Sequence, residues 1–278
     1  MHKEPMRAIT DREVETFRTD GVVLLKGLFA PEWIEGLKQG VELAMREPGP
    51  FGKNLVAPGE TGMFFMDFGI WMRHPFFREL ALESPAPAIA ARLFGTQNLW
   101  WYDDQMFVKE PGTGAPTIFH QDTPHFKCSG LQVCALWLTV DHVDKSSGSL
   151  GYVRGSHLWG KEFRPRAFTK VSAQLYDGQQ ADASMHTIPP IDEHPENYDI
   201  VYFDYEPGDC SVHHGRTIHG APGNFSSTRR RRAISLRYCG DDVRYAARPY
   251  APAQPHLEIG QKEGDPIESS VHPKVWPR

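Results

Sequence analysis

Apolar residues in the first third of the chain recur with helical spacing. Thr10 followed by Glu13 has the form of a capping box, which predicts a helix that stops at Gly21. Pro31 is suited to the first turn of a second helix, because its missing N–H has no partner there in any helix. Apolar stripes of the same period indicate helices around residues 31–45, 75–83 and 86–94.

From residue 98 onward the pattern changes to short strands separated by turns that contain Gly or Pro. Such a series favours a β-sandwich or barrel, and a double-sheet jelly roll gathers ligands from distant strands at its mouth. We therefore predict a mainly β protein, a double-stranded β-helix (cupin-like jelly roll) with flanking N-terminal helices. The expected strands cover residues 22–25, 99–109, 117–119, 131–140, 150–153, 200–203, 210–213 and 233–238.

Neither an internal repeat nor a linker divides this pattern, so we predict one domain over residues 1–278. It would consist of an N-terminal helical part (1–97), a jelly-roll core (98–240) and a C-terminal arm (241–278). Residues 48–72 are rich in Gly, Pro and aromatic residues, and we interpret them as a loop over a cavity or a hydrophobic lid on the core. Residues 160–195 have the irregular, polar character of an insertion.

Composition narrows the class of protein. The 278 residues carry a net charge of −5, which does not favour nucleic acid as a partner. No apolar run has the length of a membrane-spanning helix, and the first residues lack an apolar signal core, so we expect a cytoplasmic protein. The four cysteines form no C-x-x-C pair and are expected to be reduced, structural thiols.

Candidate chemistry centres on His120 and Asp122, which follow a predicted strand, and on His219 far downstream. Side chains two residues apart in an extended segment lie on one side of it. Two histidines and one carboxylate, with the remaining positions open, suit non-haem Fe(II). The alternative is that both histidines are ordinary hydrogen-bonded surface residues. His213 and His214 compete with His219 as third ligand, although neither precedes a turn such as Gly220 to Asn224.

An ordered set of motifs over roughly residues 12–240 resembles the phytanoyl-CoA dioxygenase family of Fe(II)- and 2-oxoglutarate-dependent oxygenases. The set is specific as a whole, whereas its first motif alone is weak. It consists of Asp20-Gly21-Val22-Val23, His120-Gln121-Asp122, Trp137, Asp144-Lys145-Ser146-Ser147-Gly148-Ser149-Leu150, Gly155-Ser156-His157, Gly208-Asp209, His219-Gly220, Asn224 and Arg231-Arg232-Ala233.

The resemblance implies that His120, Asp122 and His219 bind Fe(II), while 2-oxoglutarate chelates the iron and meets an arginine with its distal carboxylate. A planar guanidinium matches a carboxylate with two hydrogen bonds. Spacing from His219 favours Arg230 for this role, and spacing from Ala233 favours Arg231. We choose Arg231, because strand alternation places it on one face with small residues that leave room for a ligand.

Further roles follow from the same resemblance. Gln105 and Trp137 would line the cosubstrate pocket, although core packing explains the tryptophan and a polar position on the strand explains the glutamine equally well. The family often carries Ser two residues after the distal histidine, and here that position is Ala221. The carboxylate of Asp122 fills the position that a halogenase leaves open for halide, so hydroxylation is expected.

The expected partners are a small-molecule substrate and O2, with succinate and CO2 released, and we expect neither nucleic acid nor membrane as a partner. Two other readings remain open: a cupin-like metal enzyme that does not use 2-oxoglutarate, and a catalytically silent metabolite-binding protein. Residues that could face the substrate, each also explained by packing or surface charge, are Phe51, Phe65, Trp71, His125, Phe126, Arg164 and Arg166.

Overall fold

Two antiparallel sheets pack face to face in the structure, a computed structural model that describes residues 1–167, 169, 171 and 184–278. The major sheet has the strand order β1-β10-β7-β12-β4-β3-β2, with β14 also paired to β4. Its strands are β1 (Val22–Leu25), β2 (Lys53–Asn54), β3 (Phe64–Phe68), β4 (Leu99–Lys109), β7 (Val133–Thr139), β10 (Cys210–His214), β12 (Arg231–Cys239) and β14 (Lys274–Trp276).

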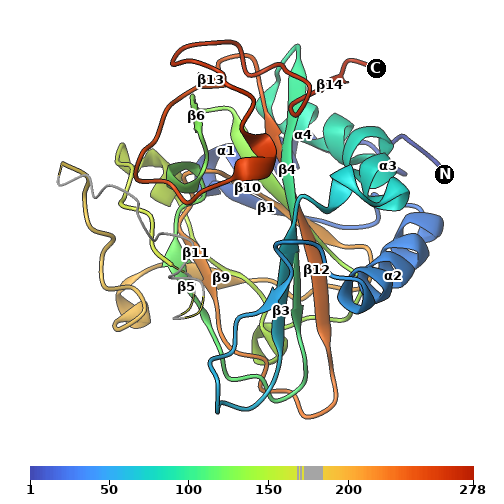
Figure 1. Cartoon of the computed structure of the whole chain (residues 1–278), viewed down its shortest axis with the longest axis vertical. Coiled ribbons are helices and arrows are strands. Elements are labelled where there is room, and N and C mark those ends of the chain that lie inside the picture. The colour runs from blue at the N-terminus through green and yellow to red at the C-terminus, as the bar shows by residue number, and fades with distance from the viewer. Residues whose placement is uncertain (168, 170, 172–183) are drawn as a thin grey trace.

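The minor sheet has the order β5-β11-β8-β9 and faces the major sheet across the candidate site (Figure 1). Its strands are β5 (Thr117–His120), β8 (Gly151–Val153), β9 (Ile200–Tyr202) and β11 (His219–Ala221). A small ribbon pairs β6 (Cys128–Ser129) with β13 (Arg244–Tyr245) of the C-terminal arm. The predicted jelly roll is confirmed by this pair of antiparallel sheets.

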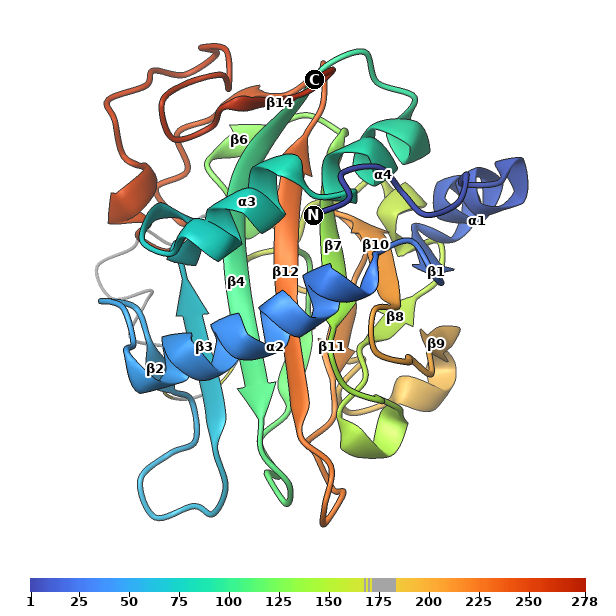
Figure 2. The ribbon, with the colours of Figure 1, turned by 90° about the vertical axis from the view of Figure 1, so that its right-hand side faces the viewer.

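Helices cover the outer face of the major sheet, where α2 and α3 cross β3, β4 and β12 (Figure 2). The predicted capping box is present, since Thr10 accepts a hydrogen bond from the Glu13 amide and Gly21 ends the helix with φ 76°. The apolar stripes of these helices and the outward side chains of the sheet form the largest core cluster. The helices are α1 (Asp11–Asp20), α2 (Pro31–Arg46), α3 (Pro75–Glu83) and α4 (Ala86–Phe94).

Residues 48–72 differ from the predicted loop. Phe64–Phe68 forms strand β3, which pairs with β4 and extends the major sheet. All five residues of β3 are buried, so the strand has no alternation of apolar and polar positions that a sequence pattern would reveal. The N-terminal part therefore adds strands as well as helices to the core.

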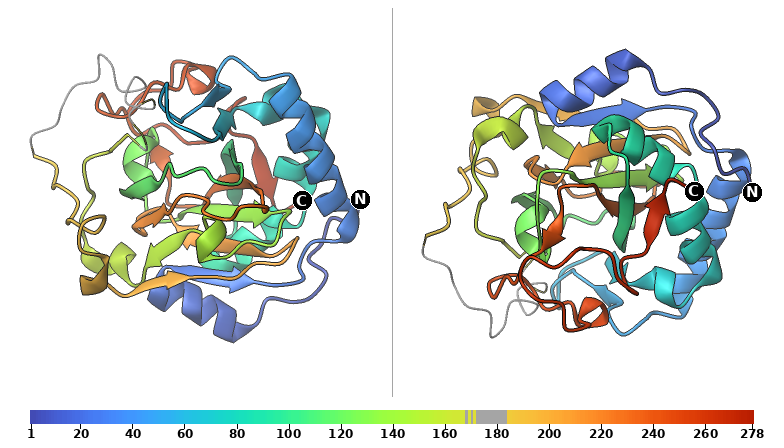
Figure 3. Two further views of the ribbon diagram at one scale, coloured as in Figure 1. Left: turned by 90° about the horizontal axis from the view of Figure 1, so that it is seen from below. Right: turned by 90° about the horizontal axis from the view of Figure 1, so that it is seen from above.

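Cross-strand register sets which side chains enter the space between the two sheets. Because alternate residues of a strand face the same side, one row of neighbours joins Phe64, Lys109 and Arg231. Four residues further along these strands, a second row of neighbours on the same face joins Gln105, Ser235 and Trp137. All three line the cavity between the sheets. In both views of Figure 3 helices α2 and α3 lie on the side of the molecule opposite the segments of the minor sheet, whereas α1, in dark blue, lies along another edge.

Three further predictions, on the cysteines, on membrane-spanning helices and on residues 160–195, can be compared with the structure. All four cysteines are buried free thiols. None of the helices in the described ranges has the length and hydropathy that crossing a membrane requires. The predicted insertion at 160–195 lies partly outside the described residues, and its described part consists of turns and short 3-10 segments such as η6 (Pro195–Asn197).

Candidate active site

His120 and His219 are direct cross-strand neighbours. His120 ends β5, His219 begins β11, and the ladder between these two strands pairs the two residues. Their imidazole centroids lie 4.3 Å apart, and both side chains are buried. The minor sheet thereby brings together two histidines that are far apart in the sequence.

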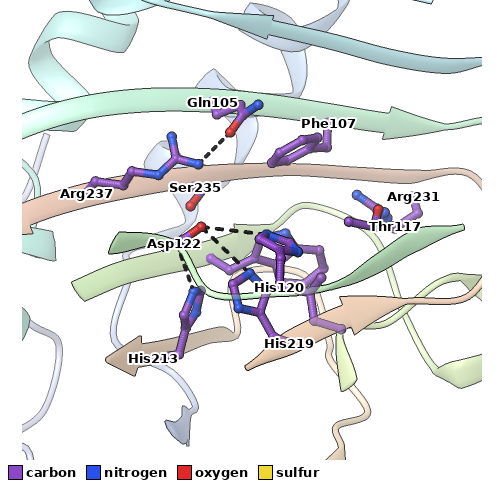
Figure 4. Close-up of a pocket in the computed structure, with 12 residues that line it drawn as sticks. Gln105, Phe107, Thr117, His120, Asp122, His213, His219, Arg231, Ser235 and Arg237 are labelled. Carbon is purple, nitrogen blue, oxygen red and sulfur yellow. Dashed lines mark hydrogen bonds and ion pairs between the residues drawn. The ribbon is translucent and has the colours of Figure 1, made fainter. Parts of the chain in front are cut away.

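Asp122 joins the two histidines, but not through the extended segment that the sequence reasoning assumed. The strand ends at His120, and Asp122 precedes the short 3-10 helix η2 (Thr123–His125) with helical backbone angles. Its amide donates to the Gly215 carbonyl at 3.0 Å, which fixes this turn. Its Oδ1 lies 3.8 Å from His120 Nε2 and 3.9 Å from His219 Nε2 (Figure 4).

The ring nitrogens that face Asp122 are the Nε2 atoms, because Nδ1 of each histidine contacts a backbone carbonyl. His120 Nδ1 donates to the Ile118 carbonyl at 2.8 Å, and His219 Nδ1 donates to the Thr217 carbonyl at 3.0 Å. Such contacts fix the tautomer and leave Nε2 as a lone-pair donor. In the described part of the chain, these two histidines and Asp122 form the group whose ligand atoms lie within 4.8 Å of one another.

Protonation states also suit a divalent cation. Burial, followed by the charge of His213, lowers the pKa of His219 to about 4, and burial lowers the pKa of His120 well below its usual value. Both imidazoles are therefore neutral at pH 7. For Asp122, burial acts in the opposite direction, but the hydrogen bond from His213 and the charge of His219 hold its pKa well below its usual range. Two neutral imidazoles and one ionised carboxylate are the donors that Fe(II) takes in such triads.

His213 does not join the ligand group, although it lies beside it. Its Nε2 is 3.2 Å from Asp122 Oδ2, the carboxylate oxygen that faces away from His120 and His219. It therefore holds the carboxylate in one orientation and leaves Oδ1 for the metal. His214, the other competing candidate, turns to the helical side and contacts the ring of Phe94.

A second feature of the site is a buried basic pair, in which Arg231 lines the cavity at the end away from Asp122 and Lys109 lies beside it. The Arg231 side chain is 1% exposed and lies between the rings of Phe64 and Trp137, with its Cζ 5.9 and 5.7 Å from their centroids. Its Nε has no hydrogen-bond partner. Lys109, next to it in the register, is fully buried and donates only to the Pro222 carbonyl, at 2.8 Å. Within the described ranges neither cation has a carboxylate partner.

The neighbours of Arg231 in the arginine run point outward, as strand alternation predicts. They are not merely solvated, however, since Arg230 binds Glu110 with both Nε and Nη2, and Arg232 binds Asp141 in the same two-pronged way. The question of which arginine faces the cavity is therefore decided for Arg231 by geometry. Its role toward a ligand stays a prediction.

The remaining predicted pocket residues also line the cavity. Trp137 is buried, and its indole N–H has no acceptor among the described residues. Gln105 lies at the opposite end from Arg231 and accepts a hydrogen bond from Arg237 (Figure 4). Ala221 is paired in the ladder with Thr117, a cavity-lining residue that the sequence reasoning did not single out.

The candidate substrate residues divide into three groups. Phe65 and Trp71 belong to the core cluster beneath the helices and lie away from the cavity. His125 and Phe126 lie near the site, since the His125 ring is 5.5 Å from that of His120 and Phe126 packs on Arg237 at 5.1 Å. The others are peripheral: Phe51 stacks on Phe68, Arg166 pairs with Asp192, and the Arg164 amide bonds to the His186 carbonyl.

Sequence reasoning missed Lys109, His213 as a support for Asp122, and Arg237. Lys109 and Arg237 continue the inward-facing rows of β4 and β12, so the alternation that selected Arg231 would have found them. Gln121 has a structural role between the two ligands. Its side chain accepts from the Phe163 amide at 2.9 Å and donates to the Arg216 carbonyl at 2.8 Å, which ties three loops together.

Comparison with known proteins points in one direction. Residues 17–233 match the family described as phytanoyl-CoA dioxygenase (PhyH). A multifunctional dioxygenase, prhA of Penicillium brasilianum, is 26% identical over 257 residues, which are 88% of this chain and 77% of that protein. Phytanoyl-CoA dioxygenase domain-containing protein 1 of Danio rerio is 21% identical over 273 residues, 81% of this chain and 88% of that protein.

Solved structures share the fold. The non-heme alpha ketoglutarate dependent carbocyclase SnoK from nogalamycin biosynthesis superposes with a TM-score of 0.76 at 24% identity, covering 99% of this chain and 100% of that one. EctD from S. alaskensis, with 2-oxoglutarate and 5-hydroxyectoine, gives a TM-score of 0.68 at 17% identity over 95% and 92% of the two chains. The predicted fold, enzyme class and cofactors are thereby confirmed. The chain belongs to the phytanoyl-CoA dioxygenase family of iron- and 2-oxoglutarate-dependent oxygenases.

Proposed function

We propose that this protein hydroxylates an unactivated C–H bond of a small-molecule metabolite, with O2 consumed and succinate and CO2 released. His120, Asp122 and His219 hold Fe(II), and Arg231 binds the distal carboxylate of 2-oxoglutarate. We further propose that the chain acts as one domain in the cytoplasm.

The observation that carries the cosubstrate assignment is the buried guanidinium of Arg231, which lies beside the buried amine of Lys109. A buried charge without a partner is costly, and Arg231 lines the same cavity as the three ligands, with Lys109 as its cross-strand neighbour. Burial lowers the pKa of Arg231 to about 10, so the group is still charged at pH 7. A dicarboxylate with one end at the metal and the other at Arg231 would supply the missing negative charge.

Other polar groups at this end fit the same ligand. Trp137 lines the cavity together with Arg231, and its indole N–H has no acceptor among the described residues. Thr117, opposite Ala221 in the ladder, offers a hydroxyl where the family's serine is missing. We propose that Thr117 replaces that donor. A cupin-like enzyme without 2-oxoglutarate has no use for the buried cations, and a silent binding protein has no use for the complete ligand group.

The chain's own groups position and protect the reaction. Iron with 2-oxoglutarate and O2 supplies the oxidising power when bound. Asp122 would bind the metal through Oδ1, with His213 holding the carboxylate in place, and would thereby take the position that a halide would need. Phe107, Trp137 and Leu150 form the apolar part of the cavity lining and would limit the access of water to the metal.

An anaerobic titration of the Fe(II)-loaded protein with 2-oxoglutarate tests this proposal. We expect a metal-to-ligand charge-transfer absorption band that saturates at one equivalent per iron and is lost in His219→Ala. Arg230→Gln serves as a matched control, because it alters the outward-facing neighbour of Arg231. Stoichiometric iron binding without the band would favour the cupin-like alternative, and absence of iron binding would reject the metal site itself.

Turnover assays then address the reaction. Oxygen-dependent succinate release, measured with candidate metabolites, should be abolished in Asp122→Ala. Incorporation of one ¹⁸O atom from ¹⁸O2 into the product would support hydroxylation. A product without added oxygen would instead indicate desaturation, epimerisation or ring closure at the same site.

A further inference from the structure

A second buried arginine lies across the site from Arg231. Arg237 is 5% exposed, belongs to β12 and lines the same cavity. Strand alternation puts Arg231, Ala233, Ser235 and Arg237 on one face, so the two arginines lie at opposite ends of an inward-facing row. Figure 4 shows Asp122 and Ser235 in the middle of the cavity, with Arg231 on one side and Arg237 on the other.

Arg237 forms no ion pair with an acid among the described residues, although its charge acts to lower the pKa of Asp122 and of Asp104 from a greater distance. Its Nη2 donates to the neutral amide oxygen of Gln105, its Nε has no partner, and no carboxylate of the described residues lies within ion-pair distance. The acid directly opposite it on β4 is Asp103. That carboxylate is bound by His256 of the C-terminal arm at 2.9 Å instead.

The neighbouring acid on β4 is also committed elsewhere. Asp104 faces the helical side and accepts the amides of Ile70 and Trp71, each at 2.8 Å. The fold thus keeps both nearby carboxylates on β4 away from Arg237. A buried guanidinium without a counter-ion costs free energy, and it is retained here at the wall of a cavity.

The cosubstrate accounts for only one of the two arginines. Of its two carboxylates, the one next to the keto group is taken by the metal, and the distal one is matched to Arg231. A second anion is therefore needed at the other end of the cavity, and the remaining ligand of this reaction is the substrate.

We propose that Arg237, oriented by Gln105, binds a carboxylate or another anionic oxygen of the substrate. This inference rests on the proposed function, in that it names the substrate class of the same site. Two aromatic rings accompany the polar groups at this end, since Phe126 packs on the guanidinium at 5.1 Å and Phe107 lines the cavity with Gln105. The substrate would then be a small amphipathic acid, anchored by its anionic end with an apolar carbon near the metal.

The test uses matched probes that differ only in charge. Benzoate, hexanoate and cyclohexanecarboxylate are each compared with the corresponding primary amide by calorimetric titration into the anaerobic Fe(II) protein saturated with 2-oxoglutarate. Saturation keeps Arg231 occupied, so that the probes report on the other end of the cavity. A charge-assisted hydrogen bond contributes about 1.5–3 kcal/mol, which predicts a preference of about 10- to 100-fold for acid over amide in at least one pair.

Variants separate the two arginines. Arg237→Gln should lose the preference for the acid while its affinity for 2-oxoglutarate, followed by the charge-transfer band, changes by less than about twofold. Arg237→Lys keeps the charge without the planar fork and should retain a reduced preference, which also guards against a misfolded glutamine variant. Arg231→Gln should behave in the opposite way, with weak 2-oxoglutarate binding.

Three results would overturn the inference: equal affinity for acid and amide in all three pairs, a preference that survives in Arg237→Gln, or a loss of 2-oxoglutarate affinity in Arg237→Gln as large as in Arg231→Gln. The last would assign Arg237 to the metal-bound carboxylate of the cosubstrate. If the protein binds no 2-oxoglutarate at all, the probes are titrated into Arg231→Gln, where acid preference would still support the Arg237 subsite and its absence would reject it.

Discussion

Replacing Arg231 with Met should make the ligand-free protein more stable and its cosubstrate binding much weaker. Methionine has a similar length and fits between the rings of Phe64 and Trp137, where the guanidinium now lies. Burial lowers the pKa of Arg231 from 12.5 to about 10, and this difference corresponds to about 3 kcal/mol against the charged form in the folded state. The penalty is fully present at pH 7, because the group is protonated in both the folded and the unfolded chain.

Allowing for imperfect packing of the new side chain, we expect the free energy of unfolding of Arg231→Met to rise by about 1–2 kcal/mol. For a domain of this size that is an increase of about 2–8 °C in Tm. The substitution also removes the repulsion between Arg231 and the buried amine of Lys109, whose pKa Arg231 lowers. This change should stabilise the protein as well.

The cosubstrate should respond in the opposite sense. Loss of a buried, two-pronged contact between guanidinium and carboxylate costs about 3–5 kcal/mol, which raises the Kd for 2-oxoglutarate by at least about 100-fold. Thermal unfolding of the Fe(II) protein under argon, with and without 2-oxoglutarate, reads both effects in one experiment. The wild-type Tm should rise with 2-oxoglutarate, and the variant Tm should start higher and stay constant.

Arg230→Met is the matched control, because it makes the same change one residue earlier, on the outward face. It breaks ion pairs with Glu110 and Glu42, so its Tm should fall slightly while its response to 2-oxoglutarate stays normal. A ligand-free Arg231→Met protein that is less stable than wild type would refute the argument about the buried charge. A variant that still binds 2-oxoglutarate normally would refute the assignment of the cosubstrate.

Three further changes test other parts of the site and fold. His213→Ala removes the hydrogen bond that orients Asp122 and should weaken Fe(II) binding about 10- to 100-fold in a dialysis assay, and unchanged affinity would show that the contact has no such role. Thr117→Val should raise the Kd for 2-oxoglutarate by about 2- to 10-fold, and adding Ala221→Ser should restore it, so a lack of rescue would reject the shared donor position. Burial opposes ionisation of Asp241, but hydrogen bonds from Thr96 and Asn98 lower its pKa to about 2, so the stability that it contributes is present above about pH 4 and is lost as the pH falls toward 2. Urea unfolding of Asp241→Asn should therefore lack about 1 kcal/mol of that pH-dependent loss, after allowance for solvent screening, whereas a pH profile identical to wild type would contradict it.

The sequence predicted most of the frame because its signals are local. The capping box of Thr10 and the glycine at position 21 bound α1, and β4 begins and ends as the aromatic-rich pattern indicated. Strand β3 was missed because a strand buried on both faces carries no period of two. Asp122 reaches the histidines through a turn whose geometry depends on Gly215, a distant residue that no local pattern identifies.

Strand alternation and the family resemblance together predicted the metal ligands and the arginine that faces the cavity. They selected Arg231, whose neighbours do face outward. Alternation places Lys109 on the inward face but could not show that its amine is fully buried, because a lysine at the end of a strand is ordinarily solvated and its burial depends on Phe64 and Pro222. The lack of an ion pair to Arg237 among the described residues could not be predicted either, because it depends on the tertiary contact by which His256 binds Asp103.

The arginine run of β12 has a consequence for folding. A slip of the strand by one residue would still present an arginine, Arg230 or Arg232, to the cavity, so the basic residues themselves specify the register poorly. The acids outside the cavity supply that information, because Glu110 and Asp141 each pair with one outward arginine and Glu42 of α2 bridges both. Neutralising these acids would therefore favour conformers in which β12 is shifted by one residue. In such conformers Arg230 or Arg232 would occupy the place of Arg231, and the side chains of Ser235 and Arg237 would point away from the metal site.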